Sequence, residues 1–171
     1  MDTDITQQER WQAALSGFDA VWTRVSGTEA PERKPPQGPP SPDGACRMRE
    51  LSKQEEQAAA YDRALAALFR GWERGVLLRH AQSALRRSAR LRAEAFLLDG
   101  RRCASGASCP RLCGTLSALR DSMLRDETAA EGYEREAKIN DCAPVRELLE
   151  CFAGERRQAA KEKRELIVRS F

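Results

Sequence analysis

Histidine, aromatic residues and long apolar runs are scarce in this sequence. His80 is the single histidine among 171 residues, and aromatic residues make up 6% of the chain. No run reaches the roughly 20 apolar residues of a membrane-spanning helix, so we predict no membrane span. The amino terminus, MDTDITQQER, is acidic and polar, unlike a signal peptide. We therefore expect a cytoplasmic protein.

Several patterns that carry chemistry are also missing. The sequence has no glycine-rich phosphate-binding loop, and no serine or cysteine nucleophile has a histidine in register with it. The 29 Lys and Arg residues are interleaved with 26 Asp and Glu residues, which leaves a net charge of +3. A charge this small and this mixed does not favour nucleic-acid binding.

Six cysteines are present, and in a cytoplasmic protein we interpret them as reduced thiols. Cys103, Cys109 and Cys113 lie in the irregular segment GRRCASGASCPRLCG at 100–114, with spacings unlike the paired C-x2-C of common zinc modules. A zinc site would need a fourth ligand, for which Cys46 is a candidate. Incidental thiols, a disulfide and a redox role are the alternatives.

The sequence divides into three regions of different composition. Residues 1–26 predict an amphipathic helix that docks on the main body, with binding to a membrane surface or a partner protein as the alternative. Residues 27–50 are rich in proline and glycine and predict a linker. Residues 51–171 show repeated helical spacing and predict the main domain. The apolar face of the helix predicted in residues 1–26 contains Trp11, Leu15, Phe18, Trp22 and Val25.

Four helices are predicted within residues 51–171. The first opens at Ser52, which can form a capping box with Glu55, and is followed by a short turn bracketed by Gly71 and Gly75. The second ends before Gly100. The inward-facing stripe of the first contains Leu51, Gln54, Ala58, Tyr61, Leu65, Leu68 and Trp72. The inward-facing stripe of the last contains Val145, Leu148, Phe152, Glu155, Ala159, Glu162 and Leu166.

The connection lengths predict the topology. Short turns join the first helix to the second and the third to the fourth, which makes two antiparallel hairpins. The segment 100–114 could span about 50 Å when extended, more than the roughly 36 Å of a helix of about 24 residues. We therefore predict an all-α four-helix bundle with one long crossover, preceded by the extra amphipathic helix.

Asp126 lies on the apolar seam of the third helix, between Met123 and Ala130. An ionised carboxylate in a helix interface is costly unless a positive charge meets it. Without such a charge, burial would raise the pKa of the carboxyl group. The sequence therefore predicts a positively charged partner opposite Asp126.

The two predicted hairpins are similar in sequence. QEEQAAAYDR at 54–63 aligns with DETAAEGYER at 126–135, and the second helices continue at nearly the same offset. The aligned positions are Gln54 with Asp126, Tyr61 with Tyr133, Ala84 with Glu155, and Arg87 with Gln158. This doubled hairpin resembles the ferritin-like superfamily, and most closely its rubrerythrin-like branch.

The resemblance implies a di-metal site that has lost most of its ligands. In that family each hairpin supplies a carboxylate and a Glu-x-x-His pair to two metal ions. Here both histidine places are lost, to Arg87 and Gln158, and His80 is out of register, as an ordinary helix-end or surface residue would be. The vestigial ligands implied by the resemblance are Glu55, Asp126, Glu127, Glu155 and Gln158.

Arg87 has two possible orientations. It can point inward and neutralise Asp126 or Glu155 as a metal would have done, or it can be one of the surface arginines of RRSARLR. We predict that Arg87 is a structural charge partner that bridges toward one of the two carboxylates.

The leading functional prediction is a non-catalytic ferritin-like bundle with a structural or protein-interaction role and no cofactor. The alternative is a rubrerythrin-like di-metal carboxylate protein with an atypical site, which would bind iron or another divalent metal and carry out peroxide or ferrous-iron oxidation chemistry. The resemblance also makes a homodimer plausible. The aromatic amino-terminal helix suggests a protein partner that the sequence does not identify.

Overall fold

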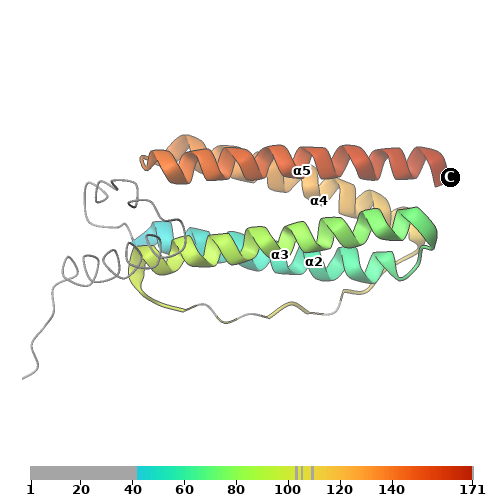
Figure 1. Ribbon diagram of the computed structural model, residues 1–171, viewed down its shortest axis with the longest axis horizontal. Helices are drawn as coiled ribbons and strands as arrows, with labels where there is room; N and C mark the ends of the chain where they lie inside the picture. The colour runs from blue at the N-terminus through green and yellow to red at the C-terminus, as the bar shows by residue number, and fades with distance from the viewer. Residues whose placement is uncertain (1–41, 103, 105, 109, 171) are drawn as a thin grey trace, which may run out of the picture. The chain divides into compact units, whose positions relative to one another are not determined.

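The computed structural model describes residues 42–102, 104, 106–108 and 110–170. These residues form four helices and no strand: α2 (Pro42–Ala66), α3 (Gly71–Asp99), α4 (Thr115–Ile139) and α5 (Ala143–Ser170) (Figure 1). The predicted helix in residues 1–26 and the linker up to residue 41 lie outside the described residues. No helix in the described ranges has the length and apolar character needed to cross a membrane.

Helix α2 begins well before the predicted start at Ser52. Residues 42–50 are helical rather than part of the linker, because proline is tolerated in a first helical turn and because Ala45 and Met48 extend the buried face of the helix. Ser52 lies in mid-helix, where its Oγ is 3.0 Å from the Oγ of Ser88. The predicted capping box was therefore wrong, and Glu55 is free for another role.

The other helix ends lie close to their predicted positions. Helix α3 ends at Asp99, and Gly100 follows with a φ of 71°, its N–H donating to the carbonyl oxygen of Phe96 at 2.7 Å. This left-handed conformation favours glycine, as expected for a helix stop. Helix α3 begins at Gly71, so Gly75 lies inside the helix and does not close the turn.

The four helices form two hairpins with the predicted topology. Helix α2 packs along α3, and α4 packs along α5, while the two pairs meet through α2 with α4 and α3 with α5. The described parts of the crossover (100–102, 104, 106–108 and 110–114) run back along the first hairpin, so that α3 and α4 point in the same direction (Figure 1). Its backbone is fixed at Gly106, whose N–H donates to Oε2 of Glu56 at 3.1 Å.

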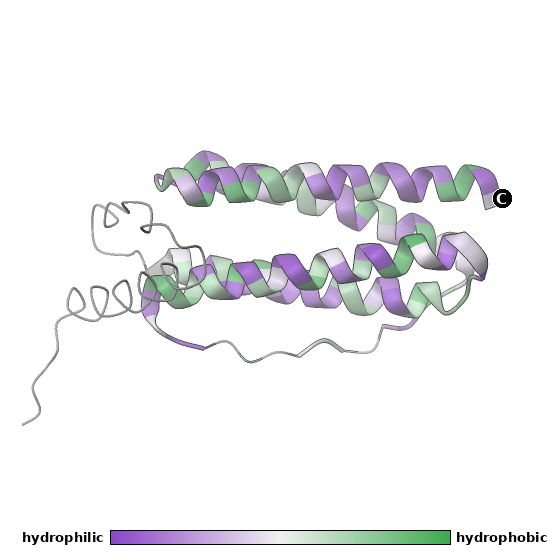
Figure 2. Ribbon diagram, viewed as in Figure 1, coloured by the Kyte–Doolittle hydropathy of each residue, from purple (hydrophilic) through white to green (hydrophobic). Residues whose placement is uncertain are grey.

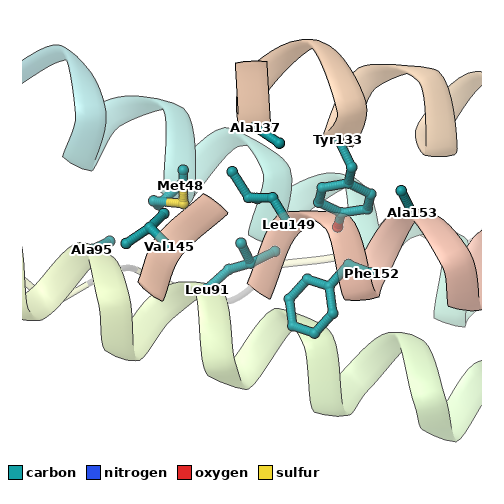
Figure 3. Close-up of a cluster of buried hydrophobic side chains, with 9 residues drawn as sticks. All are labelled: Met48, Leu91, Ala95, Tyr133, Ala137, Val145, Leu149, Phe152 and Ala153. Carbon is teal, nitrogen blue, oxygen red and sulfur yellow. The ribbon is translucent and has the colours of Figure 1, made fainter. Parts of the chain in front are cut away.

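Two larger apolar clusters occupy the interior. One surrounds Leu149 and includes the edge-to-face pair of Tyr133 and Phe152, with ring centroids 5.7 Å apart (Figure 3). The other contains Leu65 and Leu166. Hydrophilic residues nevertheless occur along the length of every helix (Figure 2), and several of them are buried. The buried charged side chains are Glu55, Glu56, Asp62, Arg87, Asp126, Arg156 and Lys163.

Candidate functional site

Asp126 is 1% exposed and meets two cations from α5. Arg156 donates from Nη1 to Oδ1, and Lys163 donates from Nζ to Oδ2 at 2.7 Å. The sequence predicts a positive partner for Asp126, and the structure supplies two.

Glu55 is a buried carboxylate with donors on three helices. Its Oε1 accepts from the hydroxyl of Tyr133 at 2.6 Å and from Nε of Arg156 at 2.9 Å. Its Oε2 accepts from Nε of Arg87 at 3.1 Å and lies 2.7 Å from Nη2 of Arg156. One side chain of α2 is thus tied to each of the other three helices.

Asp62 lies further along α2 and pairs with Lys163. The Nζ of Lys163 is 2.9 Å from both carboxylate oxygens of Asp62. Ser122 donates to Oδ1 of Asp62 at 2.6 Å and accepts from Lys163 at 2.7 Å. Each proton of the buried ammonium therefore has an acceptor, as a charge removed from water requires.

Arg87 points inward, as predicted, and is 4% exposed. Its Nη1 donates to Oε2 of Glu155 at 2.8 Å, so the predicted bridge to one of the two carboxylates is present. Its buried partner, however, is Glu55 rather than Asp126.

Together these side chains form an ionic cluster of three carboxylates and three cations, namely Glu55, Asp62, Asp126, Arg87, Arg156 and Lys163. Its formal charges cancel. The pairs Glu55–Arg156 and Asp62–Lys163 are both separated by 101 residues in the sequence. Helices α2 and α5 run in the same direction (Figure 1). The seven residues from Glu55 to Asp62 on α2 therefore lie alongside the seven residues from Arg156 to Lys163 on α5, about two helical turns on each.

The cluster controls the protonation of its members. Burial alone would raise the pKa of Asp126, but Lys163 and Arg156 outweigh it and hold the pKa below its usual value of 3.8. Burial would lower the pKa of Arg156, and Glu55 and Asp126 reverse the effect and raise it. Burial and the neighbouring Glu55 raise the pKa of Tyr133. Asp126 and Arg156 therefore remain charged and Tyr133 remains a proton donor.

The remaining predicted ligands lie outside the buried cluster, and of these Glu155 contacts it through Arg87. Glu155 is 46% exposed at the rim, and the exposed Gln158 donates to Glu162 at 3.0 Å. Glu127 is half-buried and pairs with Arg164 at 2.6 Å. Gln54, aligned with Asp126, is exposed, and its neighbour Glu55 is the buried residue.

Sequence reasoning missed Arg156, Lys163 and Asp62. The sequence predicts that the buried stripe of α5 contains Glu155 and Glu162. In the structure this stripe instead contains the two cations, Arg156 and Lys163. The signal was present, because both cations share a seven-residue repeat with the buried Leu149. Along α5 this repeat is Leu149, Arg156 and Lys163, along α4 it is Leu119, Asp126 and Tyr133, and along α2 it is Met48, Glu55 and Asp62.

His80 is buried within α3, so the prediction of a helix-end or surface residue was wrong. Its Nε2 lies 3.2 Å from Oε2 of Glu162, in a geometry that makes no hydrogen bond. Burial and the nearby charge of Lys163 lower the pKa of His80 below 6.5. The imidazole is therefore neutral at neutral pH.

The described residues contain no group of three or more His, Cys, Asp or Glu side chains placed to hold a metal ion. Cys46 and Cys113 are free and exposed, and so are Cys142 and Cys151. Cys103 and Cys109, on which the zinc interpretation depends, lie outside the described residues.

A groove of about 790 Å³ runs between α2 and α4. The buried Glu55, Tyr133 and Arg156 line it, and so does Gly132, where an added Cβ would meet nothing within 4 Å. Charged side chains of both signs form its walls: Arg47, Glu50, Asp121, Arg125, Arg135 and Glu136.

Comparisons with known proteins supply no relative for this arrangement. No family model, curated protein or solved structure matches the chain.

Proposed function

We propose that this chain is a non-catalytic, ferritin-like helical bundle with a structural or protein-interaction role. In this proposal the ionic cluster takes the place of a di-metal centre and holds the two hairpins together. The observation that carries it is the position of Arg156, whose guanidinium bonds both Glu55 and Asp126. These are buried carboxylates of α2 and α4, the helices from which the resemblance expects metal-bridging acids.

The donor set does not fit a di-metal site. Metal binding requires carboxylate oxygens with free lone pairs, whereas those of Glu55 already accept from Arg87, Arg156 and Tyr133. Two metal ions would also add charge to a cluster that is already neutral, and they would compete with Arg156 and Lys163 for Glu55, Asp62 and Asp126. Each cation would have to leave the interior or lose its proton, and both changes are costly.

Iron loading tests the proposal. The purified protein would be incubated aerobically with ferrous iron, desalted and analysed for metal, beside a variant carrying Glu55→Gln and Asp126→Asn. We expect no stoichiometric iron in either protein. About two irons per chain in the wild type, lost in the variant, would contradict the proposal and support the rubrerythrin-like alternative.

The proposed interaction role includes pairing of two copies, which the resemblance makes plausible. The concave α2–α4 groove supports it, because apolar side chains such as Leu124, 52% exposed, lie beside charges of both signs. Light scattering at micromolar concentration should then show a dimer. Gly132→Trp should fill the groove and produce a monomer with an unchanged melting temperature, whereas a wild-type monomer would contradict pairing.

A further inference from the structure

Three segments meet at the end of the bundle that contains the α2–α3 turn: this turn with the start of α3, the end of the crossover, and the end of α5. The partly buried residues that connect them to the apolar cluster of Leu65 and Leu166 are Phe69, Val76, Leu112 and Ile167. The guanidinium of Arg169 also lies 5.6 Å from the ring centroid of Trp72. We call residues 67–74, 110–114 and 166–170 the turn end.

Large apolar side chains protrude from the turn end. Leu68 and Trp72 are each 50% exposed, and Val168 is 77% exposed. Leu68 lies in the α2–α3 turn, Trp72 in the first turn of α3, and Val168 in the last turn of α5. They share one end of the bundle instead of being scattered along its sides.

The turn end is also strongly basic. Its four arginines, all exposed, are opposed by one acidic residue, the half-buried Glu73. The arginines are Arg70, Arg74, Arg111 and Arg169. The opposite end, residues 42–48, 96–102 and 136–143, has four basic and four acidic residues. That end also exposes apolar side chains, including Ile139, but has no excess of positive charge.

We propose that the turn end binds the surface of a lipid bilayer that contains anionic headgroups, without spanning it. Tryptophan and leucine insert favourably at the boundary between headgroups and acyl chains. Each arginine near an anionic surface strengthens binding roughly fivefold. Guanidinium groups and protruding apolar side chains provide both contributions at one end of the bundle, where Arg169 lies beside Trp72, and charge complementarity selects an anionic bilayer as the occupant.

The experiment is co-sedimentation of the full chain with phosphatidylcholine vesicles, with and without phosphatidylserine. The test variant combines Arg70→Glu, Arg74→Glu and Arg169→Glu. The control, Arg86→Glu with Arg90→Glu and Lys161→Glu, makes the same change in net charge at exposed positions on the sides of α3 and α5. Circular dichroism would confirm that both variants fold.

We expect the wild type and the control to bind the phosphatidylserine vesicles, with little binding to phosphatidylcholine alone. The test variant should lose at least tenfold in partitioning, and Trp72→Ala several-fold. In a chain with Trp11→Phe and Trp22→Phe, brominated lipid should quench the fluorescence of Trp72.

Four results would overturn the proposal: no binding by the wild type, equal binding to both kinds of vesicle, equal losses in the test variant and the control, or Trp72 fluorescence that brominated lipid leaves unchanged. Binding of duplex DNA that competes with vesicles and is lost in the test variant would instead assign the surface to polyanions in general. Each of these outcomes is independent of iron loading, which tests the ionic cluster.

Discussion

The guanidinium of Arg156 donates to Glu55, a residue that precedes it by 101 positions in the chain. The contact joins α5 to α2 and therefore ties one hairpin to the other. The same side chain also bonds Asp126 within its own hairpin. Because the apolar clusters lie mainly toward the two ends, this arginine is central to how the hairpins are held in register.

Replacing Arg156 by methionine should strongly destabilise the fold. Asp126 would keep only Lys163, and Glu55 would lose the hydrogen bond from Nε of Arg156 and the ion pair with its Nη2. Removing one partner of a buried ion pair lowers the free energy of unfolding by about 3–5 kcal/mol. Urea denaturation at pH 7 measures the change. The control, Arg164→Met, removes an exposed pair with Glu127 and should cost no more than about 1 kcal/mol.

Arg87→Leu should cost less than Arg156→Met, because Glu55 would keep Arg156 and Tyr133 as donors. The loss should be about 2–3 kcal/mol. Adding Glu55→Gln to Arg87→Leu should recover part of it, since the amide carries no charge. Adding Asp126→Asn should not, because Asp126 makes no bond to Arg87. Equal recovery by the two second substitutions would show that Arg87 acts through the general field of the cluster.

His80 should make stability depend on pH below neutrality. Its folded-state pKa lies below 6.5, so the unfolded chain takes up the proton more readily. The stability contributed by the neutral imidazole is full above pH 6.5 and is lost as the pH falls toward the folded-state pKa. Lys163 opposes protonation, whereas Asp62, Glu162 and Asp126 favour it. Denaturation at pH 7.5 and 5.5 should show a loss in the wild type that His80→Gln removes; an identical loss in both proteins would assign it to other groups.

The helices and their order could be predicted from the sequence because apolar spacing and turn residues are local signals. Gly100 marked the end of α3, and the length of the crossover gave its direction. The interior of α5 could not be predicted in the same way. Glu155 and Arg156 are adjacent, yet adjacent residues on a helix point about 100° apart. Glu155 was assigned to the core because it aligns with a ligand position of the family that the chain resembles, and Arg156 was not singled out, since arginine is mostly exposed in proteins.

Glu55 shows why local signals were insufficient. Its spacing from Ser52 fits a capping box, which explains a glutamate without burial. Its actual partners come from α3, α4 and α5, at sequence distances that no local pattern covers. Arg87 could be predicted because the alignment of the two hairpins placed it at an interior position. At the offset that aligns Arg87 with Gln158, Arg156 and Lys163 fall opposite Leu85 and Arg92, which are not ligand positions of the resembled family.

Asp62 and Lys163 provide the sharpest test of whether the ionic cluster sets register rather than stability. Either Asp62→Leu or Lys163→Met alone leaves a buried charge with fewer partners and should lower the free energy of unfolding by about 3–5 kcal/mol. The double variant removes both charges and leaves Asp126 paired with Arg156. Buried pairs replaced by apolar side chains of similar volume are often neutral or stabilising, so the double variant should be within about 1 kcal/mol of the wild type. A double-mutant cycle by urea denaturation measures the coupling, and simple additivity of the two losses would contradict a direct pair.

The register of the helices is measured separately. In the double variant, of the ion pairs that join α2 to α5 among the described residues, Glu55–Arg156 would remain. Broader amide resonances and faster hydrogen exchange in α2 of the double variant, at unchanged stability, would show that the second pair defines register.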